Sequence, residues 1–263
     1  MRPAAALLAS LVIVAAGCGG SENAARRELR ETAQRLGEIH SGSLTLRLLV
    51  IGTSGTKSRI GFDLRGPFEL RKNALPLASL RYTQYAGARQ ATATFVSNGT
   101  HAYALVSGKR VSLPSSAVAQ IERASSGLGI GGGNGLRIDS WLRDPKVSDG
   151  GTVGGASTDH ISAKLDVVNA ANGLLGLVRS LGRAAPTITG SNADQLRKAV
   201  KSSSIDVWTG KQDKLLRRLE LKAQLGFDVP KELQRALGNV VGANIEFELA
   251  VANPNKPVHI KGP

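Results

Sequence analysis

The sequence predicts an α+β domain built on one large, curved antiparallel sheet with helices on one face. Three observations lead to this fold class. From Leu44 onward, apolar residues recur at every second position in many short runs, which is typical of half-buried strands. Short turns separate the runs in the first half, and such turns join only antiparallel neighbours. Stretches with helical spacing of apolar residues interrupt the runs mainly in the middle of the chain.

Residues 1–17 have the features of an export signal. Arg2 gives a positive start, and the apolar run Ala4–Ala16 is shorter than the roughly 20 residues that a membrane-spanning helix needs. Cys18, the only cysteine, directly follows small residues, which resembles the lipobox of bacterial lipoproteins. We expect lipidation of Cys18, with residues 18–21 as a tether on the extracytoplasmic face of the cell membrane. The alternative is an ordinary secreted protein with one free thiol.

The first half of the mature chain begins with a helix and continues as a β-meander. Glu22–His40 carries apolar residues at helical spacing and predicts an amphipathic helix. Asn98 with Gly99, and Ser107 with Gly108, have the composition of hairpin turns. The strands expected here are 44–51, 60–65, a segment around 80–82, 91–95, 101–105 and 110–113.

The second half mixes helices and strands. A helix begins at Pro114, and the glycine-rich stretch Gly127–Gly135 follows it as a loop. Further helices are expected around 138–142, over 169–181, over 192–200 and over 230–237. Further strands are expected at 146–153, 158–167, 205–209, 215–225 and 245–251. Roughly nine to eleven strands result, and no linker divides residues 22–263, so we expect a single domain.

The charge balance favours an anionic partner. The chain has 34 Lys and Arg against 20 Asp and Glu, a formal net charge of +14. Nucleic acid is not expected, because the chain is exported and its few aromatic residues are not interleaved with the basic runs. Anionic phospholipid head groups are the expected surface, with a solvated basic face as the alternative. We expect a monomer.

Enzymatic chemistry is not predicted. Gly127, Gly129 and Gly132 satisfy GxGxxG, but a helix and not a strand precedes them. Asp159 and His160 are adjacent, so on a strand their side chains point to opposite faces and do not cooperate. The histidines lack the spacing of a metal site; they are His40, His101, His160 and His259. No catalytic residue, cofactor or metal is therefore assigned.

The stretch Ala170–Leu181 is almost uncharged and contains Gly173 and Gly176, which are poor helix formers. Two interpretations remain open. The helix packs in a filled core, or it lines a lipid cavity together with the apolar sheet face, its glycines letting the wall adjust. Periodicity alone does not separate them.

Two segments resemble a known family in residues and order: Thr158–Val167 (TDHISAKLDV) and Ile205–Leu221 (IDVWTGKQDKLLRRLEL). Together with the lipobox, the first helix, the meander and the returning strands, they resemble the LppX/LprAFG family of actinobacterial lipoproteins. The resemblance implies an open half-barrel with helices on its concave face, as in LolA-like carriers, and a hydrophobic cavity for acyl chains. The long glycine-rich loop departs from the family pattern, so the shape of the cavity entrance is left open.

The expected function is therefore that of a lipoprotein that binds lipid or glycolipid acyl chains and carries them within the cell envelope. Burial of apolar surface, worth about 25 cal/mol per Å², would drive binding with broad selectivity. The expected lining residues are Leu46, Leu48, Phe62, Phe95, Leu105, Leu174, Leu177, Val207 and Phe247. An envelope sensor or chaperone that binds a protein in the same half-barrel is the alternative, and a secreted hydrolase is a third. The sequence names neither the lipid nor an envelope transport partner.

Overall fold

The computed structural model describes residues 19–53, 59–72, 74–126, 137–180, 184–226, 242–258 and 260. Several expectations fall on residues outside these ranges: the export signal, Cys18, the loop at 127–135 and the helix over 230–237. They stay predictions.

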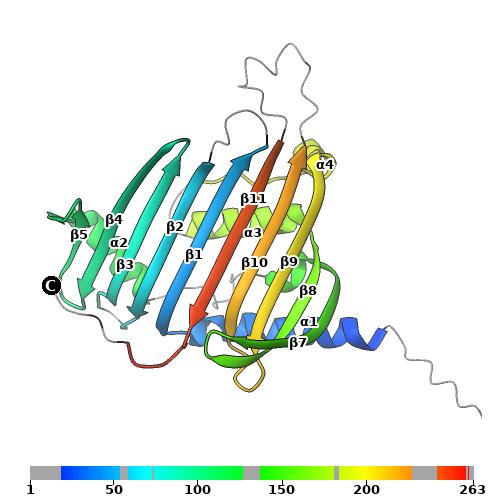
Figure 1. Cartoon of the computed structure of the whole chain (residues 1–263), viewed down its shortest axis with the longest axis horizontal. Coiled ribbons are helices and arrows are strands. Elements are labelled where there is room, and N and C mark those ends of the chain that lie inside the picture. Colours follow the sequence, from blue (N-terminus) through cyan, green and yellow to red (C-terminus); the bar gives the residue numbers. More distant parts are fainter. Residues whose placement is uncertain are drawn as a thin grey trace, which may run out of the picture.

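Within the described residues, eleven strands form one antiparallel sheet (Figure 1). The strands are β1 (Ser41–Gly52), β2 (Arg59–Glu69), β3 (Leu77–Ala86), β4 (Arg89–Asn98), β5 (Ala102–Val106), β6 (Lys109–Ser112), β7 (Leu142–Val153), β8 (Ala156–Leu165), β9 (Val200–Gly210), β10 (Leu216–Gly226) and β11 (Gly242–Ala252). Their spatial order is β6-β5-β4-β3-β2-β1-β11-β10-β9-β8-β7. The sheet is open, with β6 and β7 at its edges. This confirms the predicted fold class, and the central pairing of β1 with β11 joins the two halves of the chain.

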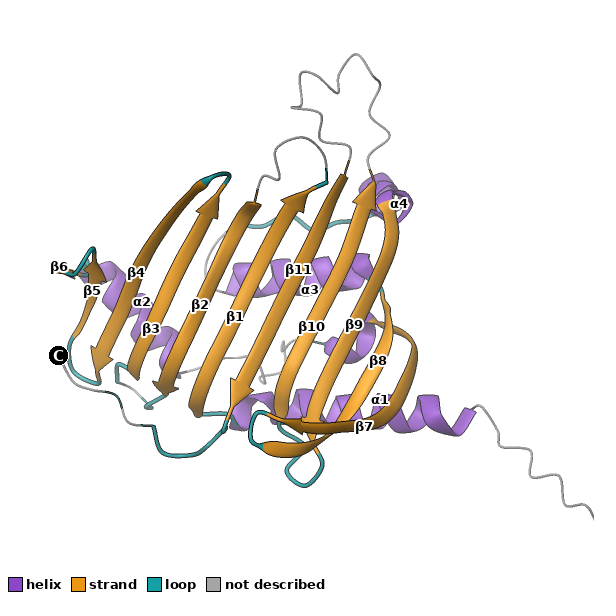
Figure 2. Cartoon of the chain, viewed as in Figure 1, coloured by secondary structure: helices purple, strands orange, loops and turns teal. Residues whose placement is uncertain are grey.

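The helices are α1 (Gly19–Arg35), η1 (Leu36–Glu38), α2 (Ser115–Ser126), η2 (Ile138–Trp141), α3 (Val167–Ser180) and α4 (Gly190–Ala199). Figure 2 shows α1, α2 and α3 on one side of the sheet, with α4 beside the end of β9. Each helix and strand expected within the described residues is present, with ends shifted by a few positions. The helices lie on one side because only that side of the sheet is consistently apolar.

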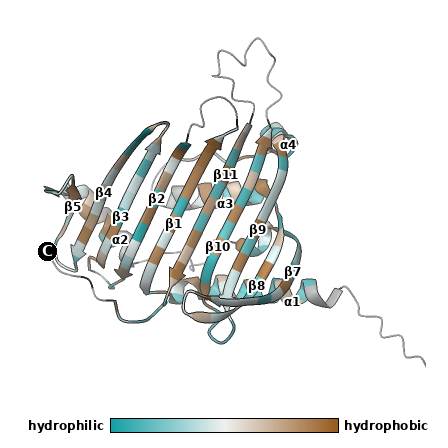
Figure 3. Cartoon of the chain, viewed as in Figure 1, coloured by the Kyte–Doolittle hydropathy of each residue, from teal (hydrophilic) through white to brown (hydrophobic). Residues whose placement is uncertain are grey.

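Alternation along the strands gives the sheet two different faces, and Figure 3 shows hydrophobic and hydrophilic residues alternating along several strands. We call the helix-bearing face the inner face; Leu48, opposite Phe247, lies on it. The other face is the outer face, where Arg47 lies opposite Glu248. Side chains directly opposite each other in the register share a face, so the pairing assigns every strand residue to one face or the other.

The filled part of the core lies on the inner face of β7–β10, beneath α1 and η2. Ile161, Val207 and Leu219 are fully buried there. Trp141 of η2 is 1% exposed and belongs to the same cluster, and η2 contacts both α1 and α3. This tryptophan therefore helps to fill the space between α1 and α3.

Gly173 of α3 lies against the indole of Trp141. A methyl group built at Gly173 would come within 2.5 Å of Trp141 Cζ2, closer than real contacts allow, whereas one at Gly176 would have Arg179 Nη2 as its nearest neighbour at 3.7 Å. The structure thus gives Gly173 a packing role, namely close approach to a buried ring. Gly176 has no such contact with the described residues.

This difference gives a matched pair of substitutions. Gly173→Ala is expected to lower the free energy of unfolding by about 1–3 kcal/mol, because the added methyl overpacks the core. Gly176→Ala is expected to raise it by up to about 1 kcal/mol, because alanine is the better helix former. Urea unfolding followed by circular dichroism measures both. Equal effects of the two substitutions would contradict the packing role of Gly173.

Candidate functional site

Burial of the inner face falls from one side of the sheet to the other. Over β7–β10 most inward apolar residues are buried, whereas over β1–β5 most are only partly buried, with Phe68 and Ala78 as buried exceptions. The partly buried ones are Leu44, Leu46, Leu48, Val50, Phe62, Leu64, Leu80 and Phe95. Four more inward residues are exposed: Ile60 (59%), Val111 (48%), Val106 (43%) and Tyr82 (37%). About half of the inner face therefore keeps apolar side chains within reach of a ligand.

Most of the lining residues expected from the sequence lie on this face. Leu46 and Leu48 of β1 and Leu174 of α3 pack at the border of the core and are partly buried. Phe62 lies opposite Leu48 and stacks on Tyr82, with ring centroids 6.2 Å apart. Phe95 packs with a smaller cluster around Phe68, Ala78 and Val251. The strand residues among them share the inner face, and their role in lipid binding stays a prediction.

Val207 and Phe247 lie on the same face but in its filled part. Val207 is 0% exposed and Phe247 is 8% exposed, so protein atoms already cover them. The sequence pattern shows which face a strand residue takes; it does not show which helix covers it. We therefore assign these two residues to the packed core.

Leu105 is a correction, because it lies on the outer face. The register puts it opposite Thr94 and Arg110, whereas its neighbours Ala104 and Val106 point inward. Strand β5 is apolar at every position, so alternation within it does not distinguish the faces, and only the pairing with β4 does. Leu177 belongs to α3, and its side chain lies outside the described part of the structure.

Sequence reasoning missed several accessible inner-face residues. Leu44 and Leu64 belong to the same alternating runs as Leu46 and Phe62, so the pattern could have found them. Ala93 of β4 lies opposite both Tyr82 of β3 and Val106 of β5, so these three side chains form one row across the inner face. Only the register of the three strands shows this row. Ile60 extends the row of Val50 toward the end of the sheet.

The outer face is polar and laced with ion pairs. Asp63 accepts hydrogen bonds from Arg47 Nε at 3.1 Å and from Arg65 Nε at 2.7 Å. Arg218 pairs with Glu220 and Glu248, so the pairs continue across β10 and β11. These contacts explain why the outer face needs no covering layer.

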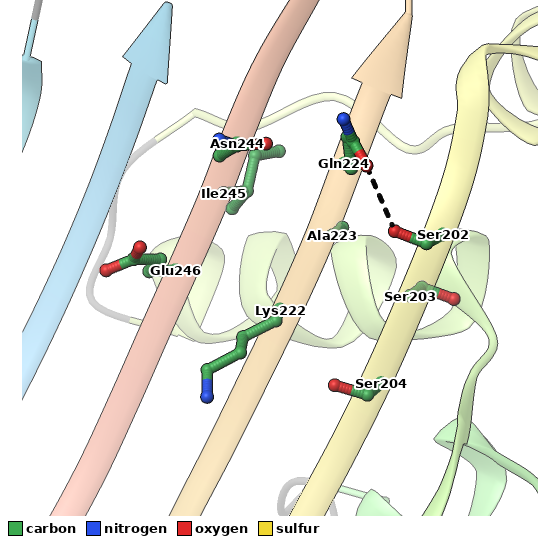
Figure 4. Close-up of a pocket in the computed structure, with 9 residues that line it drawn as sticks. All are labelled: Ser202, Ser203, Ser204, Lys222, Ala223, Gln224, Asn244, Ile245 and Glu246. Carbon is green, nitrogen blue, oxygen red and sulfur yellow. Dashed lines mark hydrogen bonds between the residues drawn. The ribbon is translucent and has the colours of Figure 1, made fainter. Parts of the chain in front are cut away.

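A shallow hollow of about 330 Å³ lies over β9, β10 and β11 (Figure 4). Strand alternation assigns most of its lining side chains to the outer face, and α3 runs on the other side of the strands in this view. The lining residues are Ser202, Ser203, Ser204, Lys222, Ala223, Gln224, Asn244, Ile245 and Glu246. Hydroxyl, amide and charged groups predominate, so this hollow does not suit an acyl chain.

Three aspartates that are at least partly buried make the stability of the fold depend on pH. Burial raises the pKa of the Asp63 carboxyl, but the hydrogen bonds from Arg65 and Arg47 outweigh burial and lower it. The same balance lowers the pKa of Asp166 beside Arg143 and of Asp213 beside Arg217. A carboxyl whose pKa is lower in the folded state stabilises the fold above its unfolded pKa, and that stability is lost as pH falls through the folded pKa.

These three carboxylates are therefore expected to make a constant contribution to the free energy of unfolding between pH 7 and about pH 5. That contribution is lost progressively below about pH 4, near the unfolded pKa of aspartate. Urea midpoints measured across this range test the expectation, with Asp63→Asn as a variant whose acid sensitivity is reduced. A urea midpoint that decreases mainly between pH 7 and pH 5 would show that other titrating groups dominate the acid sensitivity.

Helix α1 is fixed to the turn between β9 and β10. Lys214 Nζ pairs with Glu28 Oε1 at 2.8 Å and with Asp159 Oδ2 at 3.4 Å, and the hydroxyls of Thr32 and Thr209 lie 2.7 Å apart. Burial lowers the pKa of Lys214, but the two carboxylates outweigh burial and raise it.

Asp159 and His160 take different partners in the structure. Asp159 pairs with Lys214, whereas His160 lies on the outer face opposite Trp208, with its Nε2 2.9 Å from Asp206 Oδ1. The predicted separation of Asp159 and His160 is confirmed. Among the described residues, no three His, Cys, Asp or Glu side chains are placed to hold a metal ion. No described helix has both the length and the hydropathy to cross a bilayer.

Comparison with protein-family models gives no match, and neither does comparison with curated proteins. Among solved structures, the chain is similar to the crystal structure of LprF from Mycobacterium bovis. The TM-score is 0.46 at 14% sequence identity, over 92% of this chain and 98% of that chain. The chain resembles LprF. A LolA superfamily protein from Nitrosomonas europaea also matches, with a TM-score of 0.22 at 6% identity over 89% of this chain and 94% of that chain.

Proposed function

We propose that the protein binds the acyl chains of a lipid or glycolipid on the inner face of its sheet and carries the lipid within the cell envelope. One observation carries the proposal: most apolar side chains of β1–β5 that point to the helix-bearing side are only partly buried. Apolar side chains that lie side by side and stay accessible usually mark a binding site. A lipid chain lying along these strands would remove that surface from water.

The chemistry of the inner face favours an acyl chain over a polar ligand. Leu46, Leu48, Phe62, Leu64 and Phe95 present only hydrocarbon, so binding follows apolar area at about 25 cal/mol per Å². With few directional contacts available there, selectivity for chain length or head group is expected to be broad. The outer face carries ion pairs in place of such a row of accessible apolar side chains.

Lipidation of Cys18 completes the proposal. Two or three acyl chains on this residue would hold the protein on the extracytoplasmic face of the cell membrane. The contact of Lys214 with Glu28 and Asp159 supports this arrangement, because it keeps α1 docked on the sheet while the anchor holds its start. The protein would then act as a tethered monomer without catalytic activity.

Native mass spectrometry of the full chain carrying Cys18→Ser tests lipid binding without the anchor. The expected spectrum contains adducts with lipid masses that organic solvent removes. A matched pair of substitutions then distinguishes the faces: Leu64→Asn on the inner face is expected to lower lipid affinity by about tenfold, and Leu105→Asn on the outer face to leave it unchanged. Circular dichroism confirms that both variants fold.

A chain that carries no lipid and takes up none from micelles would contradict the proposal and favour the sensor or chaperone alternative. Lipid loss in both variants would show that the face assignment is wrong.

A further inference from the structure

One part of the chain contains no acidic residue. Between Glu69 and Glu122, residues 70–121 include no Asp or Glu but six basic residues: Arg71, Lys72, Arg81, Arg89, Lys109 and Arg110. In the fold this segment forms β3–β6, which is the whole of one side of the sheet (Figure 1), and then enters α2. This edge of the molecule therefore carries six of the fourteen formal net positive charges.

The same edge carries the exposed large apolar residues of the described structure. Ile60, Tyr82, Val106 and Val111 are between 37% and 59% exposed, and all four lie on the inner face of β2–β6. Tyr82, Val106 and Val111 are close in the register, and Ile60 lies two inner-face rows from Tyr82, in the row of Ala86 and Arg89. Tyr82 and Val106 flank Ala93 in one row, and Val111 lies opposite Ala104 in the next.

Two of the cations share the inner face with these residues. Arg89 lies opposite Ala86, which lies opposite Ile60, and Lys109 lies opposite Val106. Both are exposed, and neither forms an ion pair with a described residue. We call Ile60, Tyr82, Val106 and Val111, with Arg89 and Lys109, the basic corner.

Exposed apolar side chains flanked by cations, with no acidic residue among them, match the chemistry of the water interface of an anionic bilayer. Apolar residues enter the boundary between head groups and acyl chains, cations meet the phosphates, and tyrosine is favoured at this depth. The outer face of the same edge also carries cations, Arg81 and Arg110, but the exposed large apolar residues of the described structure lie on the inner face, so the corner combines both features.

We propose that the basic corner docks the protein onto the surface of an anionic phospholipid bilayer. The inference rests on the proposed function, since a lipid carrier must meet a bilayer to load or release its cargo, and it names where that contact occurs. In Figure 1 the corner lies on the opposite side of the sheet from the start of α1. Docking therefore does not use the residues next to Cys18.

Vesicle flotation with the full chain carrying Cys18→Ser tests the proposal. The probes are vesicles of phosphatidylcholine and vesicles in which about one third of the lipid is phosphatidylglycerol. Arg89→Gln with Lys109→Gln is expected to lower partition onto the anionic vesicles by about 30-fold. Tyr82→Ser with Val111→Ser is expected to lower it as well. Lys198→Gln with Lys256→Gln removes two exposed charges elsewhere and is expected to change it far less.

Equal losses in the Arg89/Lys109 and Lys198/Lys256 variants would mean that only net charge matters, and would overturn the proposal. So would a parent chain that ignores the anionic vesicles. Native mass spectra of the same variants separate this outcome from cargo binding, because the docking proposal predicts that lipid adducts persist in the Arg89/Lys109 variant. Loss of adducts with unchanged vesicle partition would assign the two cations to the cargo head group and refute docking.

Discussion

Replacement of Trp141 by alanine is expected to lower the free energy of unfolding by about 3–5 kcal/mol. The indole is 1% exposed and belongs to η2, which contacts both α1 and α3. Its removal leaves a cavity where two helices meet the filled half of the inner face, and neighbouring helices relax only partly into such a space. Chemical denaturation followed by far-ultraviolet circular dichroism measures the loss.

A double substitution checks the physical reason. Gly173→Ala is destabilising because its methyl meets the indole, so in the Trp141→Ala background the same change should cost little or even stabilise the protein. If the changes in unfolding free energy of the two substitutions were strictly additive, η2 would not fill the core. A loss below about 1 kcal/mol for Trp141→Ala alone would lead to the same conclusion.

Gly61→Ala is expected to destabilise the protein by about 3–5 kcal/mol, as the sum of backbone strain and overpacking. Gly61 has a φ of +147°, and a methyl built there would lie 1.9 Å from the backbone oxygen of Leu48. The contact involves backbone on the central strand β1, so no side-chain movement relieves it. The denaturation midpoint of the variant measures the cost.

Gly108→Ala is the matched control. Gly108 also has a positive φ, +76°, but nothing lies within 4 Å of a methyl built there. Only the backbone term remains, about 1 kcal/mol. If the two variants proved equally stable, the close approach of β1 and β2 would not be the cause.

The sequence contained most of the information needed for the fold. Alternation in Leu44–Ile51 and short turns such as Asn98–Gly99 were sufficient to predict an antiparallel meander, because both signals are local. The pairing of β1 with β11 was not predictable in the same way, since it joins residues about two hundred positions apart and depends on how the two halves meet.

The candidate site was predicted in part, for the same reason. Leu46, Leu48 and Phe62 lie on strands with clear alternation, so the sequence was sufficient to predict that they share a face. Leu105 lies on a short, uniformly apolar strand, so its face depends on its neighbour β4. Val207 was placed on the correct face, but its complete burial depends on helices distant in the sequence.

The central claim is that the partly buried inner face of β1–β5 holds acyl chains, and photocrosslinking tests it most directly. The full chain carrying Cys18→Ser is loaded with a lipid whose acyl chain bears a diazirine, irradiated, and digested for mass spectrometry with residue-level assignment. The account predicts crosslinks to inward residues such as Leu46, Phe62 and Leu64. Crosslinks confined to outward residues, such as Thr94 and Leu105 or those lining the hollow over β9–β11, would contradict it.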